Sequence, residues 1–216
     1  MRHGAGSQAL LRMLVAGFLA VTALPVAGGT VVIDFEEFYA MNYLSGYPIP
    51  EAARLSDQLA TTDGVIFSSG APYVAVVHCE PDCAPSGVNM IGGSTPDGIL
   101  TYDRAWPVVF TFVDPQNPGL PAATDFVSVR GDLWGDSQMY VILNAYDVNG
   151  ALVDSDQEFD CGGETLTVAG PGIHRVEFLG SHDWCGVALD DLTFNPVEPP
   201  TAPGSQTWAT VKAMFR

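Results

Sequence analysis

The chain has 216 residues, of which 25 are acidic and 8 are basic, so its formal net charge at pH 7 is −17. Such an acidic surface repels nucleic acids and anionic membranes, which argues against both as partners. The central part of the chain is long enough for one domain with a hydrophobic core.

The first 28 residues have the pattern of a signal peptide. Arg2 and Arg12 supply positive charge, Met13–Leu24 is uncharged and mostly apolar, and Val26–Gly28 has small residues suited to cleavage. The apolar run is short for a membrane span, although an uncleaved anchor is the alternative. We therefore expect a secreted protein, extracellular or at the cell surface, with no stable membrane span.

Short segments with two-residue hydrophobic periodicity follow, and they predict nine or ten strands. Asp147–Gly150 is a strong hairpin turn between two of them. Pro50–Leu59 is compatible with a short surface helix, and no long helical pattern is present. The pattern predicts an all-β protein, an antiparallel β-sandwich. The predicted strands lie within Val31–Phe38, Gly64–Phe67, Tyr73–His78, Val108–Val113, Asp125–Arg130, Met139–Tyr146, Ala151–Val153, Glu164–Val168, Ile173–Leu179 and Val187–Phe194.

The domain organisation follows from these patterns. We expect a signal peptide over residues 1–28, a β-sandwich domain over 29–195, a proline-rich linker over 196–206 and a C-terminal apolar peptide over 207–216. The last peptide has an apolar side at helical spacing and is mildly basic. We expect it to become ordered on meeting a partner, such as sorting or surface-attachment machinery.

Two acidic segments with strand-like composition lie near the two ends of the predicted domain. They are Val31–Phe38 and Val187–Phe194, and each places carboxylates among strand-forming apolar residues. Carboxylates are costly to bury unless a positive group meets them, and Ca²⁺ takes six to eight oxygen ligands. The pair predicts that the first and last strands lie side by side and are stabilised by structural Ca²⁺.

The cysteines indicate two disulfides, because an exported chain meets an oxidising compartment. We favour a short bridge across the turn Glu80–Asp82 and a second bridge that ties two late loops together, although three pairings are possible. The favoured bridges are Cys79–Cys83 and Cys161–Cys185. A zinc site is the alternative, since the spacing of the first two cysteines permits it. That site would use Cys79 and Cys83 with His78 and either His182 or Cys185.

Several short motifs, in this order, give the chain a family resemblance over roughly residues 30 to 195. It resembles secreted bacterial β-sandwich domains often found in proteins with a PEP-CTERM sorting tail, which look like galactose-binding-type jelly rolls and carbohydrate-binding modules. The end of the chain departs from that pattern, with no Pro-Glu-Pro signal, transmembrane helix and basic cluster. The motifs are Ile33–Glu36, Asp63–Phe67, Gly92–Ser94, Ala145–Asp147 with Gly150, Gly172–Phe178 and Ala188–Phe194.

The resemblance implies a specific calcium site. In metal-binding jelly rolls, carboxylates on the first and last strands share a structural Ca²⁺. By position these are Glu36 and Asp190, with Asp34 and Asp191 in reserve. Alternatively, these carboxylates end strands and accept backbone hydrogen bonds.

Sugar binding would need aromatic side chains on loops or on one sheet face. We interpret Gly131–Asp136 as an exposed loop that presents Trp134 between Asp132 and Asp136, and we add Tyr102 as a further ligand-binding candidate. For any of the aromatic residues, packing in the core is the alternative.

Patterns for catalysis are weak. Asp136 and Ser137 fit a turn better than an esterase motif, and no nucleophile pairs with His174 or His182 by any known spacing. Asp154–Asp160 lacks the pattern of a calcium loop and is interpreted as a solvated loop. We predict a non-catalytic secreted domain that recognises an extracellular glycan or surface polymer. A structural adhesion protein without a small ligand is the alternative, and a hydrolase is a distant third.

Overall fold

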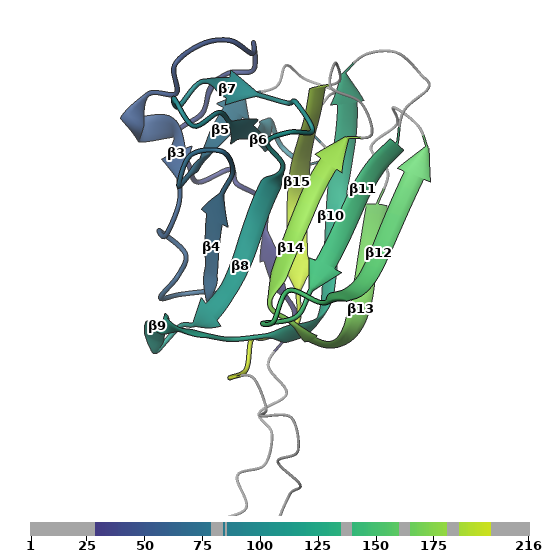
Figure 1. Cartoon of the computed structure of the whole chain (residues 1–216). Coiled ribbons are helices and arrows are strands. Elements are labelled where there is room, and N and C mark those ends of the chain that lie inside the picture. The colour runs from purple at the N-terminus through teal and green to yellow at the C-terminus, as the bar shows by residue number, and fades with distance from the viewer. Residues whose placement is uncertain are drawn as a thin grey trace, which may run out of the picture.

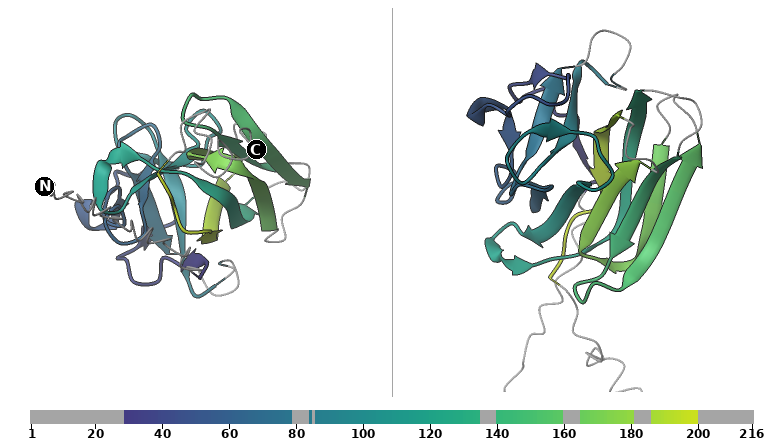
Figure 2. Two further views of the ribbon diagram at one scale, coloured as in Figure 1. Left: turned by 90° about the horizontal axis from the view of Figure 1, so that it is seen from below. Right: turned by 45° about the horizontal axis from the view of Figure 1, so that its top comes forward.

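The computed structural model describes residues 29–78, 84, 86–134, 140–159, 165–180 and 186–199, without the side chains of 132–134 and 186–187. Two β-sheets pack face to face, which confirms the predicted all-β sandwich of jelly-roll type (Figures 1 and 2). Within these residues no helix is long and apolar enough to span a membrane. The four cysteines, Asp136 and residues 207–216 lie outside the described part of the chain.

Nine strands form the first sheet among the described residues, and its main path runs β13-β10-β15-β6-β5-β2. Every pairing is antiparallel except the short one between β2 and β5. The strands are β1 (Val31–Ile33), β2 (Met41–Asn42), β3 (Arg54–Leu55), β5 (Val74–His78), β6 (Asn89–Ser94), β7 (Leu100–Thr101), β10 (Thr124–Trp134), β13 (Thr165–Ile173) and β15 (Gly186–Phe194).

Six strands form the second sheet in the same described ranges, in the order β12-β11-β14-β8-β4 with β9 beside β8. Burial alternates along its central strands, because one side of each strand faces the other sheet and the other side faces outward. The strands are β4 (Val65–Ser68), β8 (Val108–Asp114), β9 (Asn117–Pro121), β11 (Tyr140–Tyr146), β12 (Leu152–Phe159) and β14 (Arg175–Gly180).

The main core lies between the two sheets and is built around phenylalanines. Phe110 and Phe112 of β8 are fully buried, and Phe112 contacts Phe194 of β15 with ring centroids 5.0 Å apart. Phe67 of β4 connects Phe110 to Phe35, which follows β1. These rings join the two sheets through apolar burial and edge contacts.

A second, smaller core lies on the outer side of the nine-stranded sheet. Met90 of β6 and Leu100 of β7 are fully buried there, together with Ile49 from the loop before the 3₁₀ helix Glu51–Ala53. Every residue of β6 is buried, because the other sheet covers one of its faces and loops cover the other.

The two ends of the domain pair with each other, as predicted. β1 runs antiparallel to β15, with Val31 opposite Phe194 and Ile33 opposite Leu192. β15 also carries a bulge, since its register with β10 shifts by one residue next to Asp191, whose φ is 49°. Because of the bulge, side chains on the two sides of Asp191 alternate in different phase. Asp190 is therefore buried beside the second core, whereas Leu192 is buried in the main core.

The edges of the two sheets meet where β12 lies beside β13. Asp154 accepts a hydrogen bond from the N–H of Ala169 (2.9 Å), and Asp156 accepts one from the N–H of Thr167 (2.7 Å). The interpretation of Asp154–Asp160 as a solvated loop is therefore wrong for residues 154–159, which are strand. The two carboxylates accept hydrogen bonds from backbone N–H groups of β13 that would otherwise be unpaired at an open sheet edge.

Three further expectations are corrected. Gly131 to Trp134 is not a loop, because these residues extend β10 and pair with β15. Most of Pro50–Leu59 is not a helix, since only a 3₁₀ turn forms before β3. The described residues contain fifteen strands rather than nine or ten, as several span only two or three residues. Separately, an isolated antiparallel bridge pairs Glu198 with Ala123.

Candidate functional site

The outward side of the six-stranded sheet faces the viewer in Figure 1, and no other described strand covers it. We call the outward side chains of β8, β11, β12 and β14 the open face. Alternation places Ile142, Asn144 and Tyr146 of β11 on it, and Arg175, Glu177 and Leu179 of β14. Its apolar members are half-buried and its polar members lie between them.

A polar row crosses the middle of the open face. Register places Ser155, Asn144 and Glu177 side by side on neighbouring strands. The hydroxyl of Ser155 donates to Oδ1 of Asn144 (2.8 Å). These side chains offer amide, hydroxyl and carboxylate groups to a ligand lying across the strands.

Glu177 is also held by two neighbours on its other side. Arg175 forms an ion pair with it, and the Tyr146 hydroxyl donates to its Oε2 (3.1 Å). The Arg175 guanidinium lies over the Tyr146 ring, 4.3 Å from the centroid. Burial, then the charge and the hydrogen bond of Glu177, raise the pKa of the Tyr146 hydroxyl. The group is thus preorganised, since each member fixes the orientation of another.

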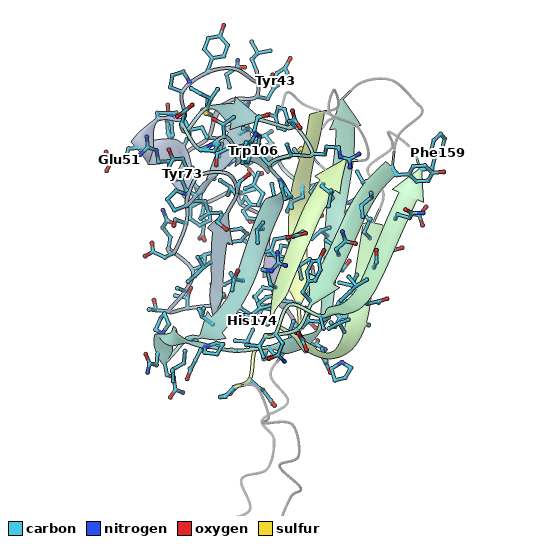
Figure 3. All side chains as sticks on the ribbon, viewed as in Figure 1. Tyr43, Glu51, Tyr73, Trp106, Phe159 and His174 are labelled. Carbon is cyan, nitrogen blue, oxygen red and sulfur yellow. The ribbon has the colours of Figure 1, made fainter. Side chains whose placement is uncertain are left out.

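An apolar row crosses the same face at one end of the strands. It runs obliquely from Phe159 of β12 and Tyr140 of β11, which lie opposite each other, to Leu179 of β14, which lies opposite Ile142. Phe159 and Tyr140 are 49% and 41% exposed, and their ring centroids lie 5.1 Å apart. The row crosses three strands, which corresponds to roughly 10 Å at the usual strand spacing. Figure 3 shows Phe159 and Trp106 at this end and His174 at the opposite end.

Two glycines of β6 bring the segment 102–106 close to the sheet. A Cβ at Gly92 would lie 2.6 Å from the Tyr102 ring, and one at Gly93 would lie 2.6 Å from the Trp106 carbonyl oxygen. The hydroxyl of Tyr102 donates to the carbonyl of Tyr43 (2.6 Å), and burial, followed by the neighbouring Tyr43, raises its pKa. The glycines therefore allow the close approach that positions Trp106.

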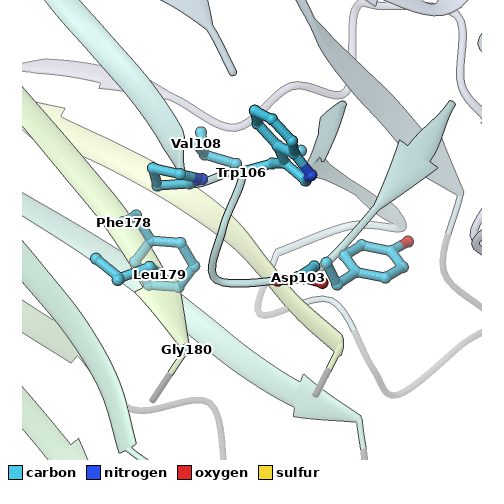
Figure 4. Close-up of a pocket in the computed structure, with 9 residues that line it drawn as sticks. Asp103, Trp106, Val108, Phe178, Leu179 and Gly180 are labelled. Atoms are coloured by element: carbon cyan, nitrogen blue, oxygen red, sulfur yellow. The ribbon is translucent and has the colours of Figure 1, made fainter. Parts of the chain in front are cut away.

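A depression lies between Trp106, Asp103 and Leu179 at this end of the open face (Figure 4). Its volume is only about 10 Å³, so it holds no more than a water-sized group. A ligand here would lie along the surface, with its flat side on the apolar row, rather than enter a deep cavity.

The predicted ligand-binding residues do not form one site in the described structure. Tyr102 lines the depression, but its hydroxyl holds a loop in place. Asp132 and Trp134 lie on β10 of the other sheet, without described side chains, and Asp136 lies outside the described residues. Their role in binding stays a prediction.

The predicted calcium ligands Glu36 and Asp190 both hold the segment before and at the start of β6. Glu36 Oε1 accepts the N–H groups of Val88 (2.8 Å) and Asn89 (2.7 Å). Asp190 Oδ2 accepts the N–H (2.8 Å) and the hydroxyl (2.9 Å) of Ser86. Asp190 is completely buried, and burial raises its pKa to about 6.

The reserve ligands have other contacts. Asp34 accepts the N–H of Glu36 (3.3 Å), and Asp191 lies 3.6 Å from Arg130. The described residues contain no group of three or more His, Cys, Asp or Glu side chains placed for a metal. Glu36 and Asp190 are thus linked through one segment, whereas Asp34 and Asp191 point to different partners.

His174 takes a structural position. Its Nδ1 lies 2.8 Å from the carbonyl of Ala122, and its backbone continues the pairing between β8 and β14. His182 lies outside the described residues.

Sequence reasoning did not assign Arg175, Glu177, Trp106 or Tyr140 to a site. The missing signal was the neighbour order of four strands, which brings together residues far apart in the chain.

No family model matches the chain, and no curated protein matches its sequence. A DUF4465 family protein from Bacteroides caccae is similar in structure, with 12% identity and a TM-score of 0.44 over 78% of this chain and 100% of that chain. The C-terminal family 22 carbohydrate binding module of Clostridium thermocellum Xyn10B has 13% identity and a TM-score of 0.40, over 68% and 97%. TmCBM61, in complex with β-1,4-galactotriose, has 15% identity and a TM-score of 0.32, over 73% and 97%. At this level of similarity, these neighbours do not identify a ligand for this chain.

Proposed function

We propose that the protein is a secreted, non-catalytic domain that binds an extracellular glycan on the open face. The observation that supports this most is the apolar row beside the polar row, both of which cross β12, β11 and β14. A sugar ring has an apolar side and a rim of hydroxyls, so it needs a flat apolar surface beside hydrogen-bonding groups. The structural adhesion role is the second candidate, but no described feature favours it over glycan binding.

The fixed geometry of the polar row also supports the proposal. Glu177 is oriented by Arg175 and Tyr146, and Asn144 is oriented by Ser155. Side chains that are already ordered lose less conformational freedom when a ligand binds. A ligand without hydroxyls would cover these polar groups without forming hydrogen bonds to them. That loss is costly, so the polar row favours polar ligands over apolar ones.

Affinity electrophoresis in gels containing xylan, galactan or galactomannan tests this function. We expect the protein to be retarded by at least one of them, and the double variant Tyr140→Ala/Phe159→Ala to lose at least tenfold in affinity. Tyr39→Ala is the matched control, because Tyr39 is exposed and lies between strands of the other sheet. Equal retardation of wild type and double variant would place the ligand elsewhere.

We also propose that Ca²⁺ stabilises the domain at Glu36 and Asp190. Two features support this: both carboxylates hold the same segment, and Asp190 is completely buried. Hydrogen bonds engage both oxygens of Asp190 and Oε1 of Glu36, so an ion would use the lone pairs that these bonds leave.

Thermal unfolding with and without a chelator tests the calcium proposal. At one hundred times its dissociation constant, Ca²⁺ bound only to the folded state adds about 2.7 kcal/mol to the free energy of unfolding. The chelator should therefore lower the melting temperature of the wild type but not of Glu36→Gln/Asp190→Asn, which keeps oxygen acceptors. An identical chelator effect in both proteins would contradict the assignment.

A further inference from the structure

A second surface, outside the open face, has the properties of a binding site. The loop that contains β2 exposes Leu44 (49%) and Tyr47 (59%), although large apolar groups are usually withdrawn from water. A pocket of about 270 Å³ opens between Met41, Asn42, Leu44 and Tyr47. We call it the loop pocket. Figure 3 shows Tyr43 of this loop beyond the end of the sandwich where Trp106 lies.

The loop pocket is preformed, because backbone hydrogen bonds fasten its Tyr47 side to the segment around β7, while Met41 and Asn42 on the other side pair with β5. The N–H of Gly46 donates to the carbonyl of Leu100 (2.9 Å), and the N–H of Leu100 donates to the carbonyl of Tyr47 (2.9 Å). The N–H of Leu44 donates to Oδ1 of Asn42 (3.0 Å). A loop that is already ordered loses less conformational entropy when a ligand binds than a loop that must become ordered.

Charge limits what the loop pocket binds. No Asp, Glu, Lys, Arg or His occurs from Phe38 to Pro50, although the whole chain carries 33 acidic and basic residues (25 + 8). Glu36, Glu37 and Glu51 flank this uncharged stretch and would repel an anion. A second copy of this chain carries the same charge of −17, which opposes close approach of two copies. The lining itself has no charged side chain to pair with an ionic ligand of either sign, so the occupant that fits is uncharged.

The lining combines apolar walls with a polar rim. Met41 and Leu44 supply aliphatic surface, Tyr47 supplies a ring with a hydroxyl, and Asn42 supplies an amide. A volume of about 270 Å³ is at the lower end for ligand pockets and suits one ring-sized group. A sugar ring matches this combination, since it has apolar faces and hydroxyls at its edge.

We infer that the loop pocket is a second glycan-binding site, which takes one uncharged sugar residue while the open face holds another part of the polysaccharide. The identity of the ligand class rests on the proposed function, whereas the pocket itself does not. Tyr102 joins the two sites mechanically, since it lines the depression at the open face and its hydroxyl holds the carbonyl of Tyr43. Two sites on one domain raise the affinity for a polymer over that for a short fragment.

Isothermal titration of the full-length protein with xylan, galactan and galactomannan, and with hexasaccharides of each, tests the inference. We expect two hexasaccharide sites in the wild type and one in Leu44→Ala/Tyr47→Ala, with at least a tenfold loss of polymer affinity. Tyr39→Ala is the matched control, because Tyr39 is equally exposed on the same loop but does not line the pocket. A single site in the wild type, or a pocket variant that behaves like Tyr39→Ala, would overturn the second site.

The open-face variant Tyr140→Ala/Phe159→Ala separates the two proposals. If it alone loses binding, the open face stands and the loop pocket is wrong. If only the pocket variant loses binding, the open face is wrong and the loop pocket stands. If the wild type binds none of the probes, both proposals are overturned. If sedimentation shows that the wild type is a dimer and the pocket variant is not, while sugar binding is unchanged, the loop serves self-association and the second glycan site is wrong.

Discussion

The two outer faces of the sandwich are used in opposite ways. Over the nine-stranded sheet, loops bury a second apolar cluster that includes Met90 and Leu100. Over the six-stranded sheet, the described strands leave Arg175, Glu177 and Leu179 half-buried at the surface. One sheet is therefore apolar on both sides along β6, whereas the other alternates.

This difference separates the face that contributes most to stability from the face on which we propose binding. Burial on both sides of β6 adds free energy to folding, roughly 25 cal/mol for each Å² of apolar surface removed from water. The open face contributes less to folding, but it keeps oriented polar groups in contact with solvent. A ligand can reach the strands themselves only on the second kind of face.

The comparison is tested most strongly by the same substitution on each face. Leu100→Ala removes a fully buried side chain from the second core and should lower the free energy of unfolding by about 2–5 kcal/mol. Leu179→Ala on the open face should cost less, because part of its surface is already exposed to water. Urea unfolding of both variants measures the difference. Equal losses would show that the open face is packed as tightly as the covered one.

A smaller effect is expected at the edge where the two sheets meet. Asp154→Ala/Asp156→Ala leaves the N–H groups of Thr167 and Ala169 without their acceptors and should cost about 1–3 kcal/mol. It should also promote association, because an open strand edge accepts another strand. Urea unfolding and sedimentation measure the two consequences.

The matched control for the edge is Asp154→Asn/Asp156→Asn, which keeps an oxygen acceptor at each position. We expect it to lie closer to the wild type in both measurements. An alanine variant that is as stable and as monomeric as the asparagine variant would show that these hydrogen bonds do not protect the edge.

Periodicity predicted much of the fold. The alternation of Arg175, Val176, Glu177 and Phe178 gave the correct facing of β14, and the acidic end segments gave the correct pairing of β1 with β15. Both features are local or depend on one pair of segments. The first follows from the two-residue period of a strand, and the second from the carboxylates that both end segments place among apolar residues.

The errors arose where distant segments decide the structure. Asp154 and Asp156 resemble a solvated loop by composition, yet they are held by β13, 11 to 15 residues away. Gly131 to Trp134 resembles a turn, yet it pairs with β15, more than 50 residues later. The open face needs residues from β8, β11, β12 and β14, whose order in the sheet no local pattern provides.

The smallest expected effect concerns the charges of the open face, and it separates their role in binding from any role in folding. Glu177→Gln keeps the shape and an acceptor for Tyr146, and partly exposed ion pairs contribute little, so stability should change by less than about 1 kcal/mol. Removing the carboxylate charge should lower the pKa of the Tyr146 hydroxyl, since that charge helps to raise it. Arg175→Gln should raise the same pKa, because the guanidinium favours the phenolate.

Ultraviolet titration of tyrosinate, with Tyr146→Phe to identify the signal, measures both shifts. The group of Arg175, Glu177 and Tyr146 serves binding if three results occur together. The two variants shift the pKa of Tyr146 in opposite directions, both keep the free energy of unfolding of the wild type, and both are retarded less than the wild type in gels that contain the polysaccharide. Shifts of the same sign would mean that Arg175 and Glu177 do not act on Tyr146 as a pair.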